Sequence, residues 1–339
     1  MPKFIGNHPE IKLFSFLTTS LEEIKMPGKS KKDEWIKITL SAPPELVDPL
    51  SNFLTEIGTQ GVFQEESEPD ILNDFAKSTE REELMAYFPS DTSAKKRLAS
   101  LKVYIDSLSE IFPELDKPDL SIETITNPNW EEQWKKYFKP LRISKNIVVK
   151  PTWERYTPTG RDIIIEIDPG MAFGTGQHPS TRMCVQAIED ILLKDRSFEK
   201  WRVLDVGTGT GILGISCAKL GAQKVVCLDI DPKAVEIAYK NIAINGVEDR
   251  INIFNDDVLM YNDIFNLIVA NLTAKTLIKL RDHLISMTET GGYLVLSGII
   301  DQDRKVVEEF FLTDDVSLHS IITEKEWVCY LLKKEGKGN

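Results

Sequence analysis

Between residues 35 and 125, short stretches that alternate apolar and polar residues are interrupted by two longer stretches with the apolar spacing of a helix. Residues 35–40 (Trp-Ile-Lys-Ile-Thr-Leu) alternate as a half-buried strand does, and residues 93–112 carry apolar side chains at helical spacing. In chain order the predicted elements are a strand (35–40), a helix (45–57), two strands (61–65 and 83–88), a helix (93–112) and a strand (120–125). This βαββαβ order predicts a ferredoxin-like α+β domain over residues 35–127.

From residue 147 onward, apolar strand patterns alternate with helical ones to the end of the chain. Such alternation predicts an α/β fold with a doubly wound, mostly parallel sheet. The strand patterns fall at residues 147–149, 163–167, 203–206, 225–228, 251–254, 267–270, 293–297 and 327–332. We therefore expect four parts, which are an N-terminal extension (1–34), the ferredoxin-like domain (35–127), a linker helix (128–145) and the doubly wound domain (146–339).

The predicted linker helix has one aromatic face. Trp130, Trp134, Tyr137 and Phe138 stand at i, i+4, i+7 and i+8, which places them on the same side of a helix. Such a stripe either packs between two domains or contacts a substrate, and we favour packing.

Composition and charge narrow the function classes. The chain has 339 residues, of which 42% are hydrophobic, and a net charge of −12. An acidic chain lacks the cationic surface on which nonspecific nucleic-acid binding rests, so no direct nucleic-acid binding is expected, whereas a basic protein partner is compatible. No apolar stretch approaches the ~18 residues of a membrane span, and the N-terminus lacks a secretory signal pattern. The four cysteines are scattered and predict reduced thiols, and the four histidines lack the spacing of metal ligands, so no metal site is expected. We expect a cytoplasmic protein that is a monomer.

The most informative stretch is residues 201–231. An apolar run enters a glycine loop, a helical pattern follows, and a second apolar run ends at Asp229. This is the strand–turn–helix–strand unit of a nucleotide-binding α/β sheet. Residues 209–214 fit the G-x-G-x-x-G fingerprint of dinucleotide sites, whereas residues 205–211 fit the D-x-G-x-G-x-G loop of S-adenosylmethionine methyltransferases.

Charge and spacing favour the second cofactor. The first glycine after the strand is Gly207, and counting from it puts Ile212 where the third dinucleotide glycine belongs. Asp205 ends the strand, where its carboxylate would repel a pyrophosphate but attract the sulfonium and ammonium of S-adenosylmethionine. Asp229 suits either cofactor, since its carboxylate can accept both ribose hydroxyls. We therefore expect S-adenosylmethionine rather than NAD, bound near Asp205, Gly207, Gly209 and Asp229; the structural alternative is a turn that only lets helix and strand pack closely.

A second unusual stretch, residues 168–181 (Asp-Pro-Gly-Met-Ala-Phe-Gly-Thr-Gly-Gln-His-Pro-Ser-Thr), predicts a loop before a helix. Phe173 in this loop could cover an adenosine face. Thr181 stands near the start of the helix, where its hydroxyl could cap the helix or contact a ligand. His178 resembles a general base, but its place before a proline in a turn is at least as compatible with a structural role.

Asn271 lies at the C-terminal end of a predicted strand, where open α/β sheets bind ligands. Its side-chain oxygen could accept a hydrogen bond from a substrate N–H and orient the nitrogen lone pair. The structural alternative is a cap on the next helix, for which asparagine is favoured. Asp256 and Asp257 follow another strand, where one could bind an adenine amino group or both could form a solvated turn.

Four stretches together make the chain resemble one family, the ribosomal protein L11 methyltransferases of the PrmA type. They are residues 130–142, residues 168–181, the 205–211 loop with Asp229, and residues 270–274. The resemblance covers roughly residues 34–335, including a region at 35–66 that is similar to the family's substrate-recognition domain. It leaves two alternatives to consider: a small-molecule or RNA methyltransferase on the same fold, and a noncatalytic S-adenosylmethionine-binding module.

The resemblance implies a seven-stranded Rossmann-like methyltransferase domain after the ferredoxin-like one. It implies S-adenosylmethionine as cofactor, with contacts from Thr181, Gly207, Asp229 and Asn271. It further implies that ribosomal protein L11 is the substrate, trimethylated at lysine side chains and at the N-terminal α-amine. The family more often has threonine where this chain has Gln177 and Ser180, which changes the hydrogen-bonding groups of the loop but none of the implied contacts.

Overall fold

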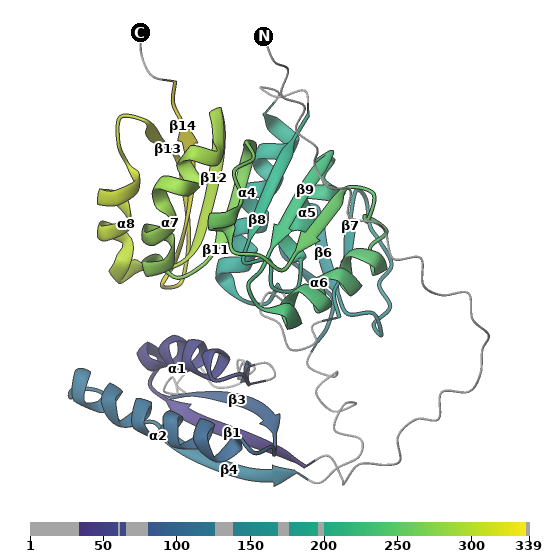
Figure 1. The fold of residues 1–339 in the computed structure, drawn as a ribbon. Helices are drawn as coiled ribbons and strands as arrows, with labels where there is room; N and C mark the ends of the chain where they lie inside the picture. Colours follow the sequence, from purple (N-terminus) through teal and green to yellow (C-terminus); the bar gives the residue numbers. More distant parts are fainter. Residues whose placement is uncertain are drawn as a thin grey trace, which may run out of the picture.

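In a computed structural model, the described residues form a small domain around a four-stranded sheet and a large domain around a seven-stranded sheet, to which a further three-stranded sheet is added (Figure 1). The structure describes residues 34–59, 62–65, 81–125, 138–168, 176–195 and 200–336. The expected N-terminal extension, apart from residue 34, and residues 128–137 of the expected linker helix lie outside these ranges, as does Phe173.

The small domain has an antiparallel sheet of strand order β2-β3-β1-β4. Its elements are β1 (Trp35–Ala42), α1 (Pro44–Glu56), β2 (Val62–Glu65), β3 (Glu82–Pro89), α2 (Ala94–Ile111) and β4 (Asp119–Ile125). Every second residue of β1 is buried, because those side chains face the core that α1 and α2 share with the sheet. The predicted βαββαβ order and ferredoxin-like fold are confirmed.

Phe138 packs against side chains of both domains. It is buried against Met85 and Tyr87, which stand on the sheet face that α1 and α2 leave uncovered, and it meets Trp153 edge-on with ring centroids 6.5 Å apart. Packing between domains is therefore the role of this one residue of the aromatic stripe. The predicted linker helix does not extend to residue 145, because Pro140 cannot continue a helix and β5 (Leu141–Arg142) follows.

The large domain has a seven-stranded sheet of order β10-β9-β8-β11-β12-β14-β13. Its strands are β8 (Arg202–Val206), β9 (Lys224–Leu228), β10 (Ile251–Phe254), β11 (Phe265–Asn271), β12 (Thr288–Ile300), β13 (Val316–Glu324) and β14 (Trp327–Lys334). Its helices are α4 (Pro179–Lys194), α5 (Ile212–Lys219), α6 (Pro232–Ile244), α7 (Ala274–Met287) and α8 (Arg304–Phe311), with 3₁₀ turns η2 (Val258–Met260) and η3 (Asp301–Asp303). The first five strands of the order run parallel, and β14 is antiparallel to both of its neighbours, β12 and β13. The edge strand β13 therefore runs in the same direction as the first five strands. The predicted doubly wound α/β fold is confirmed.

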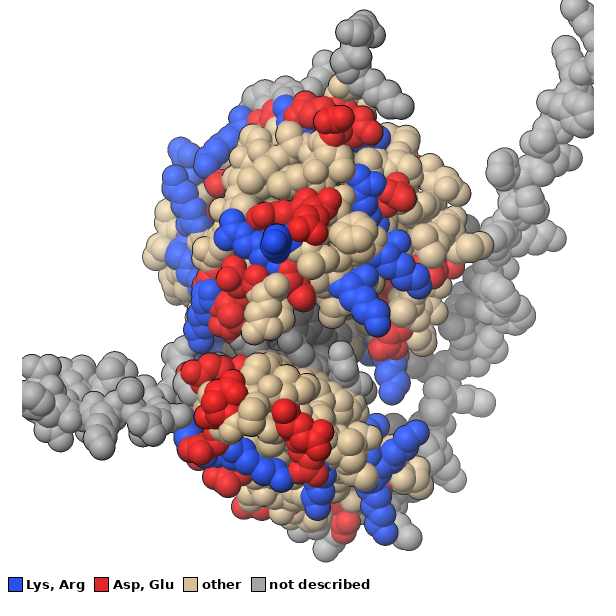
Figure 2. Space-filling model, turned by 90° about the vertical axis from the view of Figure 1, so that its left-hand side faces the viewer, with Lys and Arg blue, Asp and Glu red and all other residues tan. Residues whose placement is uncertain are grey.

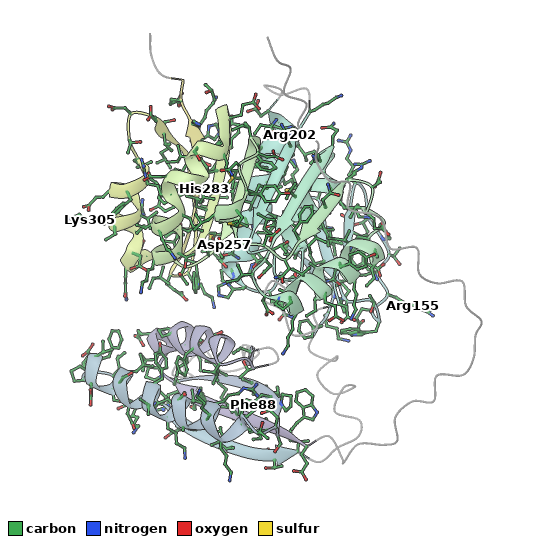
Figure 3. All side chains as sticks on the ribbon, viewed as in Figure 1. Phe88, Arg155, Arg202, Asp257, His283 and Lys305 are labelled. Atoms are coloured by element: carbon green, nitrogen blue, oxygen red, sulfur yellow. The ribbon has the colours of Figure 1, made fainter. Side chains whose placement is uncertain are left out.

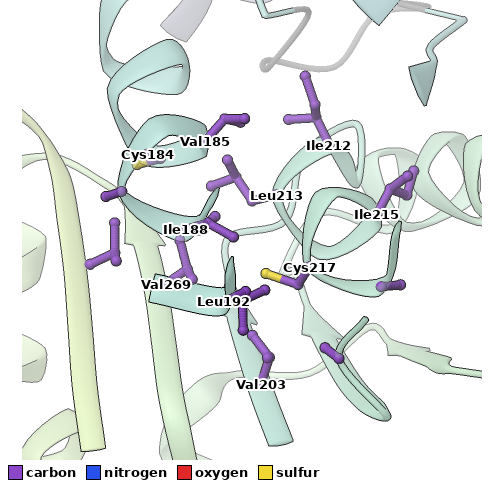
Figure 4. Packing of buried hydrophobic residues seen from close by; sticks show 14 of the residues in the cluster. Cys184, Val185, Ile188, Leu192, Val203, Ile212, Leu213, Ile215, Cys217 and Val269 are labelled. Atoms are coloured by element: carbon purple, nitrogen blue, oxygen red, sulfur yellow. The ribbon is translucent and has the colours of Figure 1, made fainter. Parts of the chain in front are cut away.

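Alternate residues of each central strand point into two different cores. Val203 of β8 packs under α4 and α5, whereas its neighbour Leu204 packs under α7. Figure 4 shows the first core, in which Ile188 of α4 and Cys217 of α5 meet Val203 and Val269 of the sheet. Burial on both faces explains why these strands read as continuous apolar runs. All four cysteines are buried free thiols.

Two strand predictions need correction. The runs at 147–149 and 163–167 do not join the large sheet: β6 (Ile147–Lys150) and β7 (Ile163–Glu166) form a separate three-stranded sheet with β5. An apolar run predicts a buried strand but does not encode which strand it pairs with. The sequence pattern also missed β13, an edge strand whose residues are mostly only partly buried or exposed.

Candidate active site

The C-terminal ends of β8, β9 and β11 meet at one cavity of about 700 Å³. Ligands of doubly wound sheets bind at this end, and the volume is that of a small-molecule site. The small domain contributes Thr59, Asp91 and Arg97 to the lining, so the cavity lies between the two domains. Figure 3 places Asp257, another lining residue, at the edge of the large domain that faces the small one.

The glycine loop forms one wall of the cavity. Gly207, Gly209 and Gly211 all have positive φ, which glycine adopts without a steric penalty. A side chain at Gly207 would also collide with Leu272, since a Cβ there would lie 2.7 Å from Leu272 Cδ2. The loop is held by two backbone bonds to the carbonyl of Leu228, so its shape depends on the neighbouring strand β9.

Asp229 lines the cavity with an oriented carboxylate. Its Oδ2 accepts a 2.9 Å hydrogen bond from Gly209 N–H, and its Oδ1 accepts one of 2.9 Å from Asp231 N–H. These bonds use one lone pair of each oxygen and leave the carboxylate able to accept from a ligand. The geometry fits the predicted place beside a ribose.

Asp205 does not contact the cavity, which corrects the expectation that its charge lies beside the cofactor. Its side chain is 0% exposed, and its Oδ2 accepts from Thr208 Oγ1 at 2.6 Å and from Gly214 N–H at 2.9 Å. Burial raises the pKa of this carboxyl to about 6. Asp205 therefore stabilises the glycine loop from the buried side, because its Oδ2 holds Thr208 of the loop and Gly214 of α5 together.

Asn271 ends β11 and lines the cavity, and its Nδ2 donates a 3.3 Å hydrogen bond to Thr181 Oγ1. Neither residue is the helix cap that a structural role would require, because Thr273 occupies the N-cap of α7 and His178 that of α4. Thr181 is 1% exposed and stands behind Asn271 rather than among the lining residues. The contact engages the amide nitrogen and leaves Oδ1 as the acceptor.

His178 has a structural role. Its Nδ1 accepts a hydrogen bond from Ser180 N–H, which caps α4, and its ring meets Trp327 edge-on with centroids 4.5 Å apart. Burial lowers the pKa of His178 to about 4, so the ring is neutral at physiological pH. A general-base role at the cavity is not supported.

Gly298 is a site residue that sequence reasoning missed. It follows Ser297 near the C-terminal end of the β12 pairing with β11, and its φ is +80°. A Cβ there would lie 2.6 Å from Leu272 O and 3.0 Å from Asn271 Oδ1, so only glycine leaves room for the Asn271 turn. The signal was available as a glycine directly after an apolar strand, beside the strand that ends in Asn271.

Asp256 and Asp257 both line the cavity. Asp257 Oδ1 accepts from Leu259 N–H and caps η2, and both aspartates are exposed. Counting all lining residues, five aspartates face three lysine or arginine side chains, and the apolar Val206, Leu228 and Ile230 lie among them. A mostly acidic, partly apolar lining fits adenosine and a cationic sulfur better than a pyrophosphate. Within the described part of the chain, no cluster of side chains suited to a metal ion was found.

The comparison with known proteins decides the family. The model of the family "Ribosomal protein L11 methyltransferase (PrmA)" matches residues 34–335. The chain belongs to this family. A ribosomal protein L11 methyltransferase of Pelobacter propionicus is 35% identical over 305 residues, which cover 90% of this chain and 99% of the relative. One of Bacillus licheniformis is 35% identical over 318 residues, covering 89% and 100%.

A crystal structure of the ribosomal protein L11 methylase of Lactobacillus delbrueckii subsp. bulgaricus superposes with a TM-score of 0.54 at 30% identity. It covers 59% of this chain and 100% of that one. Membership of this methyltransferase family confirms S-adenosylmethionine as the predicted cofactor, in place of a dinucleotide. In the residues that the structure describes, no helix has the length and apolar character needed to cross a membrane.

Proposed function

We propose that this chain methylates amines of ribosomal protein L11, namely lysine side chains and the N-terminal α-amine, up to the trimethyl state. The observation that carries the proposal is the family match over residues 34–335, joined to an asparagine acceptor on the cavity wall. The relatives' names give L11 as the protein they methylate. The choice of amines and the trimethyl state rest on the family resemblance.

Asn271 is the proposed catalytic residue. When bound, S-adenosylmethionine supplies an electrophilic methyl group on its sulfonium. An attacking lysine must be neutral, although its free pKa is ~10.4, and desolvation in the cavity lowers that pKa. Asn271 Oδ1 accepts an N–H of the neutral amine and aims its lone pair, while Thr181 fixes the amide through the 3.3 Å bond to Nδ2. Catalysis is then mainly positioning.

The surroundings of Asn271 suit repeated methylation. It continues as Leu272, Thr273 and Ala274, without the Pro-Pro-Tyr turn of many nitrogen methyltransferases. The absence of that turn is consistent with an amine that rotates between transfers. This supports the trimethyl state as the end point.

The cofactor contacts form the second part of the proposal. Asp229 accepts the ribose hydroxyls, and the backbone of Gly207 and Gly209 forms the adjoining wall. Asp205 acts through the loop. For Phe173, which lies outside the described residues, the proposal keeps the sequence-based expectation that it covers the adenosine face. We further propose that the protein acts as a cytoplasmic monomer without a nucleic-acid partner.

Mass spectrometry tests the acceptor directly. Purified L11 and ribosomal RNA are incubated in separate arms with methyl-labelled S-adenosylmethionine, and an L11 sample with chemically blocked amines serves as the matched control. We expect L11 to gain one, two and then three methyl groups on single amines, and the blocked sample to gain none. Labelled RNA with unlabelled L11 would overturn the proposal. The surface shown in Figure 2, where Lys and Arg are interspersed with Asp and Glu, favours the protein arm.

A further inference from the structure

Two asparagines one turn apart attach α6 to the free edge of β7. Asn245, at the C-cap of α6, accepts from Glu166 N–H at 3.0 Å and donates to Glu166 O at 2.6 Å. Asn241 does the same two residues further on, accepting from Asp168 N–H at 2.9 Å and donating to Asp168 O at 3.3 Å. The two side-chain amides thus take the place of a neighbouring strand, since residues two apart present their backbone groups on one edge.

Asn241 differs from Asn245 in one bond. Its Nδ2 also donates at 2.9 Å to the carbonyl of Thr210, which lies inside the glycine loop, whereas the second donor bond of Asn245 goes back to Asn241 O within the helix. Asn241 is 0% exposed, so these bonds have no competition from water. A second contact lies one turn earlier, where Gly211 sits so close to α6 that a Cβ there would come within 3.2 Å of Ala238 Cβ.

The glycine loop needs such external support. Its glycines adopt left-handed conformations. A glycine has more allowed backbone conformations than any other residue type, so the loop does not hold this shape by itself. Asp205 and Leu228 hold the start of the loop, and Asn241 holds its end. The same amide also fixes Asp168, which lies two residues after the end of β7, the edge strand of the three-stranded sheet.

We propose that Asn241 is a positioning residue for the cofactor, because a single buried amide sets the glycine loop against Asp168. It touches no substrate, and it acts through the shape of the loop. Asn245 anchors the same helix to the same strand without contact to the loop, so it separates anchoring from positioning. The inference rests on the proposed cofactor site at Gly207, Gly209 and Asp229.

The test compares Asn241→Leu with Asn245→Leu in the full-length chain. Leucine keeps the branched shape and the number of side-chain heavy atoms of asparagine, is bulkier, and removes every side-chain hydrogen bond. We expect both variants to lower the melting temperature, and only Asn241→Leu to raise the Kd for S-adenosylmethionine, by about tenfold, while Asn245→Leu stays within about twofold of the wild type. Equal affinities in two folded variants would overturn the inference. Failure of the wild type to bind S-adenosylmethionine would instead count against the proposed function.

Hydrogen exchange of the wild type gives an answer even where Asn241→Leu does not fold. A bound cofactor that stabilises the loop also stabilises the groups tied to it, so exchange of the Asp168 amide should slow more than that of the Glu166 amide. The two amides differ in their asparagine partner, which makes each the reference for the other. Equal changes in exchange at the two positions would contradict a positioning role.

Discussion

Four polar residues at the cavity and the glycine loop fall into two layers that differ in what they bond to. Asp229 and Asn271 line the cavity, and each is oriented by protein groups while keeping acceptor capacity for a ligand. Asp205 and Asn241 lie beneath the loop, 0% exposed, and their hydrogen bonds go to protein groups. The wall layer can therefore change ligand energies with little effect on the fold, whereas the lower layer changes the fold and the ligand together.

The largest expected effect is on the wall, at Asn271. Asn271→Ala should lower kcat about 10²- to 10³-fold, the size typical of losing one oriented polar contact to the reacting group, and leave S-adenosylmethionine binding measurable. Single-turnover kinetics with L11 and calorimetry with the cofactor separate the two quantities. Thr181→Val is the matched variant, because it removes only the partner of Nδ2 and should cost less. Wild-type turnover in Asn271→Ala would refute the positioning role.

The next effect belongs to the lower layer and depends on pH. Burial raises the pKa of Asp205 from 3.8 to about 6, so the native state holds this proton more tightly than the unfolded chain. The resulting stabilisation is fully present below pH 3.8 and is lost as the pH rises through 6, a change of about 3 kcal/mol. Urea unfolding of wild type and Asp205→Asn from pH 4 to pH 7.5 should show the difference between their unfolding free energies shift by most of this amount, with the wild type becoming less stable relative to the variant as the pH rises.

His178 acts in the opposite sense in an overlapping range. Burial lowers its pKa from 6.5 to about 4, so its contribution is lost as the pH falls through 4. The wild type and Asp205→Asn both keep His178, so its contribution cancels in the difference between their unfolding free energies. A difference that does not change with pH would show that Asp205 titrates alike in the folded and unfolded chain.

Asp229, in the layer that lines the cavity, is expected to have the next largest effect. Asp229→Ala should weaken S-adenosylmethionine binding about 10- to 100-fold, because hydrogen bonds to a charged acceptor contribute about 1.5–3 kcal/mol. Calorimetry gives the Kd, and thermal melting shows whether losing the bond from Gly209 N–H also affects the fold. Asp229→Asn keeps a neutral acceptor, so its Kd for S-adenosylmethionine should lie between those of the wild type and Asp229→Ala. An unchanged Kd would remove Asp229 from the proposed ribose site.

Sequence reasoning reached the wall layer better than the lower one. Strand ends are visible as the point where an apolar run stops, so Asp229 and Asn271 could be placed at the ligand edge without coordinates. Asp205 is also near a strand end, but the alternation of faces along β8 turns it inward, and a motif does not state that direction. Asn241 carries no sequence signal, since its partners Asp168 and Thr210 are far away along the chain. The separate small sheet was missed for the same reason.

The smallest effect is expected one residue from Asn241. Lys240 forms an ion pair of 2.7 Å with Glu236 on the exposed side of α6, where water competes for both charges. Lys240→Ala should leave the unfolding free energy at the limit of measurement and the Kd for S-adenosylmethionine unchanged, because most exposed pairs contribute little. Adjacent residues on one helix would then differ from no effect to a tenfold loss of affinity, because Asn241 is buried and bonded to the glycine loop whereas Lys240 is exposed. A cofactor effect at Lys240 as large as that at Asn241 would mean that α6 responds to any substitution, and the distinction between the two layers would fail.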